Sequence, residues 1–295
     1  MKTIVLILLS LSAVITKAQP FNVEVSQEGS SPQLLGKINK EALLSAPYKE
    51  WFNKGFEEYE PSEAVISKLK TALSEYTITL FLGTWCGDSK REVPKFYKIL
   101  DEANFPLQRL TTIGVDRERA TYKQSPGGEE EGLNIHRVPT FIFYKDGKEA
   151  NRIVEFPVTT LEQDILNILQ GNGYIPSYNA VKIVNDALVE MGSEKFQKKA
   201  YKLIPKLEKE AKKASELNTY ANVLFFSERQ DEAIVVAQLN TRLFPNEAFV
   251  FESLANKLYQ RDQFSEALKN YEIALKLDPK NEKVDETIKT LRSKV

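Results

Sequence analysis

The chain has 295 residues, which is enough for two domains with separate hydrophobic cores. With 42% hydrophobic and 27% charged residues, its composition is that of a soluble globular protein. The 40 basic and 41 acidic residues give a net charge of −1, so bulk charge offers no basis for binding nucleic acid or an anionic membrane.

The first 18 residues have the pattern of a secretory signal peptide. Met1-Lys2 is a short basic start, residues 4–11 form an apolar run, and Thr16 and Ala18 are small residues placed before a cleavage site. A membrane anchor is the alternative, but the apolar stretch is short for a bilayer span. The sequence therefore predicts export to the periplasm or out of the cell, with no stable membrane insertion after the signal peptide is removed.

The next segments lead into the first domain. Residues 19–33 are polar and contain Gly29-Ser30-Ser31-Pro32, so we expect a flexible lead-in. Residues 34–60 carry several aromatic side chains, which we expect to form a helical extension whose rings belong to the core and not to a ligand site. Apolar spacing over residues 62–73 predicts an amphipathic helix.

Cys86 is the only cysteine, and it stands between two predicted elements. Residues 76–82 are apolar and β-branched, which is typical of a buried strand, and residues 90–100 have helical apolar spacing. At a helix N-terminus, free N–H groups and the helix dipole favour a thiolate. In an oxidising compartment a lone cysteine cannot form a structural intrachain bridge. Cys86 is therefore a free or intermolecularly paired thiol, and a buried, inert cysteine is the alternative.

The elements after this helix complete an α/β domain. Residues 107–116 predict a second strand parallel to the first, because a helix connects the two. Residues 121–134 read as an exposed acidic loop. His136 is the only histidine and has no partner of metal-ligand type, so we predict neither a metal nor a cofactor. A helix over 161–169 closes the domain, and Gly171-Asn172-Gly173 marks its boundary.

Taken in order, these features resemble the thioredoxin superfamily. The segment Trp85-Cys86-Gly87-Asp88-Ser89 is similar to the active-site turn of that family, with serine in place of its second cysteine. Pro94 matches its kinking helix proline, and Val138-Pro139 resembles its cis-proline loop. The resemblance implies a mixed sheet flanked by helices over residues 34–172, including the N-terminal extension. It also implies that the backbone of Val138 pairs with a substrate chain beside the thiol.

Beyond residue 173 the sequence is helical and repeats every 34 residues. Four pairs of residues have this spacing: Ala221 and Ala255, Leu224 and Leu258, Ala233 and Ala267, and Pro245 and Pro279. This is the tetratricopeptide period, so residues 173–295 resemble an all-α tetratricopeptide-like domain, with a capping helix pair over 178–212 and a terminal helix over 282–295. Such repeats build a groove that could hold a peptide or helix of a partner.

Two functions of different class remain open. In the first, Cys86 attacks a disulfide or mixed disulfide of a protein partner, and an external thiol releases it. Ser89 cannot resolve the adduct because a hydroxyl does not exchange with sulfur, but it can donate a hydrogen bond to the thiolate, whereas Asp88 disfavours the thiolate. The chain would then be a thiol-disulfide oxidoreductase or isomerase without a resolving cysteine.

The second function is a non-catalytic protein-binding scaffold of the cell envelope. The candidate catalytic residues are Cys86 and Ser89, and those shaping the site are Trp85, Gly87, Asp88, Val138 and Pro139.

Overall fold

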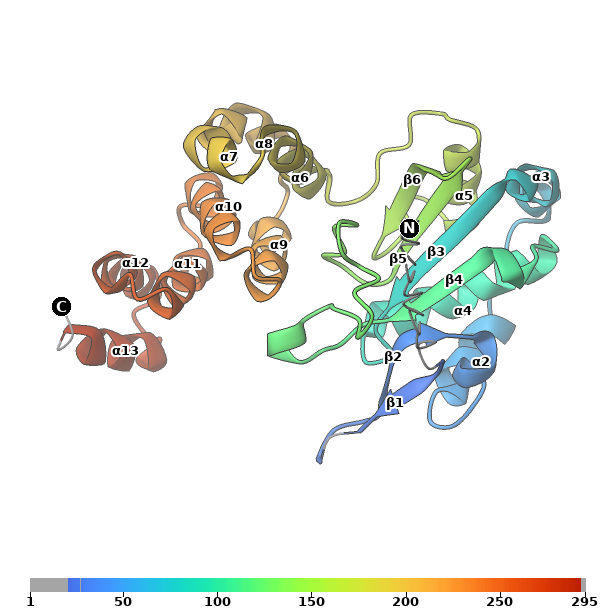
Figure 1. Cartoon of the computed structure of the whole chain (residues 1–295), viewed down its shortest axis with the longest axis horizontal. Helices are drawn as coiled ribbons and strands as arrows, with labels where there is room; N and C mark the ends of the chain where they lie inside the picture. Colours follow the sequence, from blue (N-terminus) through green and yellow to red (C-terminus); the bar gives the residue numbers. More distant parts are fainter. Residues whose placement is uncertain (1–20, 27, 293–295) are drawn as a thin grey trace, which may run out of the picture.

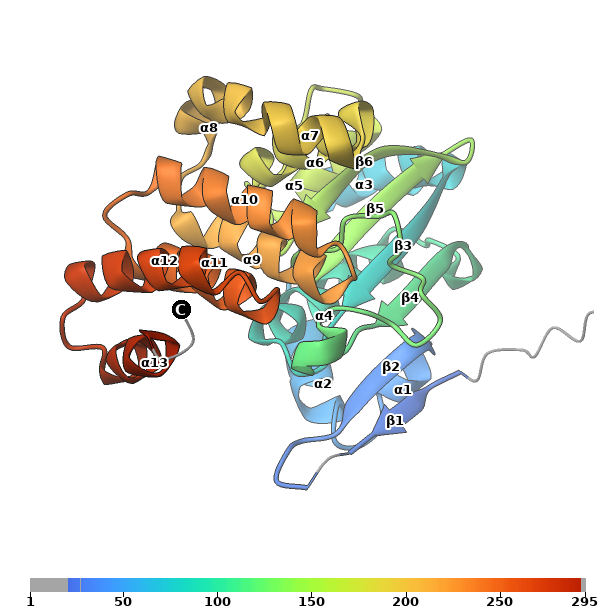
Figure 2. The same cartoon turned by 60° about the vertical axis from the view of Figure 1, so that its left-hand side comes forward.

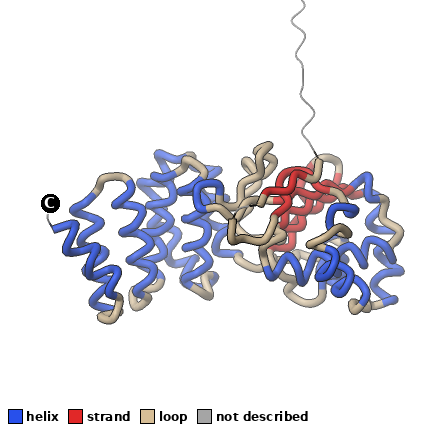
Figure 3. Tube along the Cα trace, turned by 90° about the horizontal axis from the view of Figure 1, so that it is seen from below, coloured by secondary structure: helices blue, strands red, loops and turns tan. Residues whose placement is uncertain are grey.

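The computed structural model describes residues 21–26 and 28–292, so the predicted signal peptide lies outside the described residues. The chain first builds a sheet with helices and then a stack of helices alone (Figure 1). Figure 3 shows the strands gathered in one half of the molecule, with the C-terminal end at the far side of the helical half. We call these halves the sheet domain (β1 to α5) and the helical domain (α6 to α13).

The sheet domain contains a mixed sheet with strand order β1-β2-β4-β3-β5-β6. Strands β3 and β4 are parallel and are joined by a helix, as the sequence predicts, whereas all other neighbouring pairs are antiparallel. The strands are β1 (Val23–Val25), β2 (Gln33–Ile38), β3 (Tyr76–Leu82), β4 (Leu110–Gly114), β5 (Thr140–Lys145) and β6 (Lys148–Val154).

One expectation for the N-terminal segments is wrong and another holds only in part, because α1 (Lys40–Leu43) and α2 (Lys49–Glu57) do form a helical extension within residues 34–60. Strand β1 lies inside the lead-in that we expected to be flexible, and β2 occupies the start of the expected helical extension. Strand β2 pairs with β4 so closely that a Cβ on Gly114 would overlap the backbone at Leu34. The physical reason is this long-range pairing, which gives β2 a buried position in the sheet that local spacing does not reveal.

The helices of the sheet domain pack on one face of the sheet. They bury the even-numbered residues of β3, such as Leu80, and the aromatic residues Tyr48 and Phe52, so these rings belong to the core as expected. These helices are α1 (Lys40–Leu43), α2 (Lys49–Glu57), α3 (Glu63–Ala72), α4 (Gly87–Glu102) and α5 (Leu161–Leu169). The apolar side of each longer helix therefore faces one shared core.

The opposite face of the sheet is covered by the loop at residues 115–139. Phe81, Ile113 and Ile142 form a smaller core there together with Val138. The loop is not simply an exposed acidic segment, because Ser125 is buried and its hydroxyl donates to Glu129 and Glu130. These carboxylates accept hydrogen bonds within the loop and are only partly solvated, which corrects the expectation for residues 121–134.

The helical domain contains two consecutive helix pairs with the predicted 34-residue offset. Helices α9 (Ala214–Phe226) and α11 (Ala248–Gln260) match at both ends, as do α10 (Gln230–Leu243) and α12 (Phe264–Leu277). The helices of each pair run side by side (Figure 2). Ala221 and Ala255 are fully buried in the core of this domain, as their small side chains predict. Before and after these pairs stand α6 (Asn179–Met191), α7 (Ser193–Lys199), α8 (Ile204–Glu210) and α13 (Glu282–Arg292).

Asn240 breaks the repeat pattern, because Ala274 stands at the corresponding place of the next pair. The Asn240 side chain is buried and donates to the Ala214 carbonyl over 2.9 Å. In this repeat a side-chain hydrogen bond therefore stands at the position where the next repeat has only the small side chain of Ala274. None of the described helices has the length and apolar character needed to cross a membrane.

Candidate active site

Cys86 lies at the turn between β3 and α4, where the spacing of apolar residues predicts it. It is the N-cap residue of α4, with φ −83° and ψ 129°, and its amide donates to the Gly83 carbonyl over 2.8 Å. Its side chain is half-buried and is a free thiol. Cys86 thus stands at the end of α4 where the first N–H groups have no intrahelical partner and carry partial positive charge, although its own side chain makes no capping hydrogen bond to them.

The thiol meets the loop that carries Pro139. The Cys86 Sγ lies 3.3 Å from the Val138 carbonyl oxygen and donates a hydrogen bond to it. The Val138–Pro139 peptide bond is cis, which the family resemblance implied. The structure thus brings together two segments that are 52 residues apart in sequence, and both hold residues singled out from the sequence.

Ser89 and Asp88 differ in burial and in their partners. Ser89 is 0% exposed, and its hydroxyl accepts a hydrogen bond from the Gly83 amide over 3.2 Å. Within the described residues, the Ser89 hydroxyl therefore bonds to the backbone of the turn, and the expected hydrogen bond from Ser89 to the Cys86 sulfur is not formed. The Asp88 carboxylate is paired with Arg91 at 2.7 Å, which offsets part of the negative charge that would oppose a thiolate.

A hydrogen bond and a ring contact hold the Trp85 side chain in place. Its indole N–H donates to the Val115 carbonyl over 2.9 Å, and its ring centroid lies 6.3 Å from that of Tyr122. Gly83 makes this packing possible, because a Cβ at that position would come within 2.6 Å of the indole ring. Sequence reasoning missed Gly83, although a glycine directly after a buried strand is a sign of close approach. Gly87, by contrast, has open space where a Cβ would stand.

A group of charged residues near the thiol was not foreseen from the sequence. Lys123 is 4% exposed, and its ammonium donates to the His136 carbonyl over 2.6 Å. Burial, and next the charge of Arg137, lower the pKa of Lys123 to about 7, while Glu155 and Cys86 act in the opposite direction. Arg137 forms an ion pair with Glu155 at 3.2 Å. No periodicity or motif marks Lys123, because only the folded loop buries it.

The same loop is in contact with the helical domain. Arg137 donates to the Ser215 carbonyl at the start of α9 over 3.1 Å, and Tyr178 donates to Glu155. The His136 ring lies edge-on to Tyr178 and Tyr220, with centroids 5.7 and 6.1 Å away. The residues that precede Pro139 are therefore held by both domains.

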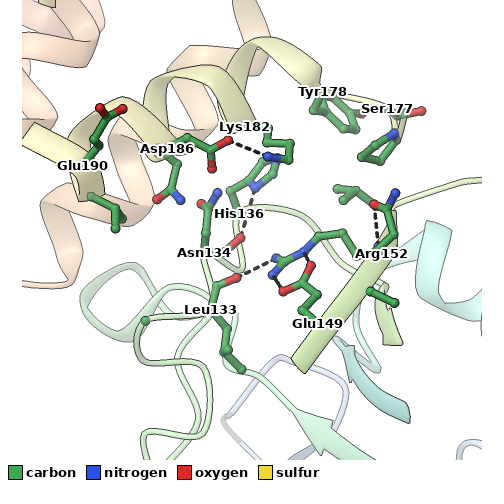
Figure 4. Close-up of a pocket in the computed structure, with 17 residues that line it drawn as sticks. Leu133, Asn134, His136, Glu149, Arg152, Ser177, Tyr178, Lys182, Asp186 and Glu190 are labelled. Atoms are coloured by element: carbon green, nitrogen blue, oxygen red, sulfur yellow. Dashed lines mark hydrogen bonds and ion pairs between the residues drawn. The ribbon is translucent and has the colours of Figure 1, made fainter. Parts of the chain in front are cut away.

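His136 also lines a pocket of about 630 Å³ between the sheet domain and α6 (Figure 4). Arg152 closes one side of it by donating to the Leu133 carbonyl and pairing with Glu149. Burial lowers the pKa of His136 to about 3, so the imidazole is neutral at physiological pH. Within the described residues, no three side chains of the types His, Cys, Asp and Glu come together as a metal site.

Comparison with known proteins places this geometry in a family. No family model matches the chain. A thioredoxin of Geodia cydonium is 31% identical over 87 residues, which cover 30% of this chain and 73% of that protein. A thioredoxin of Aspergillus fumigatus is 30% identical over 89 residues, with the same coverage of both chains. The chain belongs to the thioredoxin family.

The thioredoxin-like domain is thus joined to helical repeats. The name of one similar protein describes the same combination. A TPR (tetratricopeptide) repeat-containing thioredoxin of Arabidopsis thaliana is 29% identical over 99 residues. The match covers 34% of this chain and 23% of that protein, so the chain spans about a quarter of this relative. The expected architecture, a thioredoxin-like α/β domain followed by a tetratricopeptide-like domain, is confirmed.

Proposed function

We propose that the protein is an exported monothiol thioredoxin-like oxidoreductase or isomerase that acts on protein partners through mixed disulfides at Cys86. The observation that carries the proposal is the position of the Cys86 thiol at the start of α4, 3.3 Å from the Val138 carbonyl. The N-terminus of α4 places the partial positive charge of its first N–H groups at this turn, which is a common setting of reactive thiols. Membership of the thioredoxin family supports thiol chemistry at this turn.

The proposed reaction begins with attack of the Cys86 thiolate on one sulfur of a partner disulfide. A new S–S bond forms between Cys86 and that sulfur, the original S–S bond breaks, and the second partner sulfur leaves as a thiolate. No electrons are gained or lost overall in this exchange. Ser89 offers no sulfur for a second attack from within the site, so the mixed disulfide waits for another thiol.

Two thiols could release the partner, and they give different outcomes. If a thiolate of the partner attacks its own sulfur in the adduct, Cys86 is freed and the partner carries a rearranged disulfide, which is isomerisation. If an external thiol attacks the same sulfur, Cys86 is freed and the external thiol stays bonded to the partner. The reverse of that second exchange removes a small thiol from a partner protein.

Export is a separate part of the proposal. It is supported by the basic start, the short apolar run and the small residues before position 19. In an oxidising compartment the substrates would be proteins whose disulfides are forming or mispaired, and these are the partners that a monothiol isomerase requires.

The proposal is tested by refolding a disulfide-scrambled ribonuclease in a buffer of reduced and oxidised glutathione. The chain without residues 1–18 should restore ribonuclease activity faster than its Cys86→Ala and Cys86→Ser variants, which lack the nucleophile. Equal rates for all three proteins would remove the oxidoreductase proposal. Partner binding retained by Cys86→Ala together with equal rates would support a non-catalytic scaffold.

A further inference from the structure

A pocket between the two domains adjoins the residue that packs on Trp85 of the active-site turn. Its volume is about 490 Å³, and it is bounded by the loop after β4 and by helices α9 and α11. The green turn at residues 119–121 extends from the sheet toward these two helices in both Figure 1 and Figure 2. Tyr122 lines the pocket, and its ring centroid lies 6.3 Å from that of Trp85, the neighbour of Cys86. Tyr122 therefore connects this pocket with the residue next to the thiol.

The charge of this interdomain pocket is unbalanced. Arg117, Arg119 and Lys257 line it, and Glu252 is the acid among its described lining residues. Glu252 accepts a hydrogen bond from Asn281 over 3.2 Å. Arg117 has a buried Nη2 atom that lacks a hydrogen-bond partner among the described residues. Arg117 also pairs with Glu118 at 3.7 Å, so the pocket presents Arg119, Lys257 and the unpartnered Nη2 of Arg117 to the Glu252 carboxylate, which favours an anionic occupant.

Lys257 is the most buried of these cations, with 4% of its surface exposed. Its ammonium contacts the Asn222 side-chain oxygen at 2.6 Å and the Ser253 hydroxyl at 2.9 Å, and both are neutral groups. Burial, and next the charge of Arg119, lower the pKa of Lys257 to about 8, so it remains largely protonated at neutral pH. A buried ammonium with neutral partners lacks the counter-charge that buried ions normally have.

The rest of the lining suits a protein segment. Phe225, Phe226 and Phe249 supply an apolar surface beside the cations. The Arg119 guanidinium lies over the Phe226 ring, 5.6 Å from its centroid, so it is held at the pocket wall. A side chain with a carboxylate would meet the cations while a neighbouring apolar side chain meets the rings.

We propose that the interdomain pocket binds a carboxylate-bearing, aromatic-containing segment of a protein substrate and so places the substrate's sulfur at Cys86. This inference rests on the proposed function, because it names the class of partner that the thiol attacks. Recognition comes from both domains, with Arg117 and Arg119 in the thioredoxin-like domain and Lys257 in the helical repeats. Tethering at the pocket raises the effective concentration of the substrate sulfur at the thiol.

The test measures how fast Cys86 forms a mixed disulfide with activated peptides. Each synthetic peptide carries one cysteine bonded to 2-thiopyridine, and the released thiopyridine is followed by its absorbance. In one set the peptide contains Glu-Phe-Glu and in the matched set Gln-Phe-Gln, and Gly-Ser spacers of increasing length separate this segment from the cysteine. At low salt we expect the best acidic peptide to react about tenfold faster than its neutral match.

Three variants of the full chain locate the effect. Lys257→Met and Arg119→Gln should each bring the ratio of acidic to neutral rates close to one, whereas Lys269→Met should leave it unchanged because Lys269 is exposed on α12. Arg119 is also exposed, so its variant keeps the test valid if Lys257→Met fails to fold. An equal rate for both peptide sets in the natural chain would overturn the pocket proposal.

A neutral small disulfide, 2,2′-dithiodipyridine, separates the two proposals. If it reacts normally and the peptides show no charge preference, the pocket proposal fails and the thiol chemistry stands. If it fails to react, the thiol chemistry fails, and the pocket is then judged by fluorescence anisotropy of the labelled peptides with the Cys86→Ala chain. Tighter binding of the acidic peptide supports the pocket, and equal binding overturns it.

Discussion

At the scale of single residues, Gly83 controls the position of Trp85. A Cβ at residue 83 would come within 2.6 Å of the indole ring, so Gly83→Ala must displace Trp85 from its hydrogen bond to Val115. We expect Gly83→Ala to lower the free energy of unfolding by about 1–3 kcal/mol and to alter the rate of Cys86 alkylation by iodoacetamide. Urea unfolding and alkylation kinetics measure the two effects.

The matched control for this substitution is Gly87→Ala. Gly87 is exposed at the first position of α4, and a Cβ there meets nothing within 4 Å. Its variant should stay within about 0.5 kcal/mol of the natural chain. Equal destabilisation by both substitutions would contradict the role assigned to Gly83.

Lys123 makes stability depend on pH. Its pKa is lowered from 10.5 to about 7 in the folded chain, first by burial. Between these values the unfolded chain binds more protons than the folded chain, so stability rises with pH. Below pH 7 both states are protonated, and the cost of burying the charge is constant.

Lys123→Met removes this dependence. Between pH 7.5 and 9.5, we expect the unfolding free energy of the natural chain to rise relative to the variant by about 1.4 kcal/mol per pH unit at most. Urea unfolding in a Cys86→Ala background measures the difference without a contribution from the thiol. Parallel pH profiles for the two chains would mean that Lys123 keeps its ordinary proton affinity.

At the scale of elements, the loop before Pro139 is held by groups from both domains. Arg137 donates one hydrogen bond to Glu155 and another to the Ser215 carbonyl of α9. We expect Arg137→Gln to speed amide hydrogen exchange about tenfold in two separate segments, 134–140 and 214–219, because one side chain joins them. Mass spectrometry of exchanged peptides measures both segments.

The control for this substitution is Arg261→Gln. Arg261 forms an exposed ion pair with Asp231 at 3.3 Å, within the helical domain. Loss of an exposed pair should change exchange in neither segment. Faster exchange at 134–140 alone in Arg137→Gln would show that the contact with α9 does not restrain the helical domain.

The elements that the sequence predicted are those whose signal is local. The turn at Cys86 was predicted because a buried strand and an amphipathic helix adjoin it, and α9 to α12 were predicted by their 34-residue offset. Strand β2 was missed because its burial comes from pairing with β4, about 75 residues away. The burial of Lys123 was missed because it also depends on how the chain folds, and the loop that buries Lys123 has no periodic pattern in the sequence.

At the scale of the whole molecule, the sequence separated two domains but could not show how they meet. The contacts between His136 and Tyr220, and between Gln124 and the Phe226 carbonyl, join residues that have no common motif. These contacts matter for experiments, because deletion of the helical domain would expose the loop beside Pro139 as well as remove the groove. Point variants of the full chain are therefore the better test of a shared function.

The last prediction concerns covalent adducts in cells. Without a second cysteine, mixed disulfides at Cys86 should persist until another thiol arrives, so the natural chain should act as its own trap. Acid-quenched cells should yield adducts that disappear with reductant and with Cys86→Ala. Non-reducing gels followed by mass spectrometry measure their number and identity.

Two further variants give this prediction its control and its limit. Ser89→Cys should reduce the adducts, because a thiol at residue 89 could attack the Cys86 sulfur and release the partner. Ser89 is fully buried beneath the turn, so undiminished adducts in this variant would place position 89 out of reach of the mixed disulfide.

Lys257→Met should reduce the number of different partners, since the interdomain pocket selects them. An unchanged set would separate the thiol from the helical repeats, and a complete lack of adducts in the natural chain would favour the scaffold.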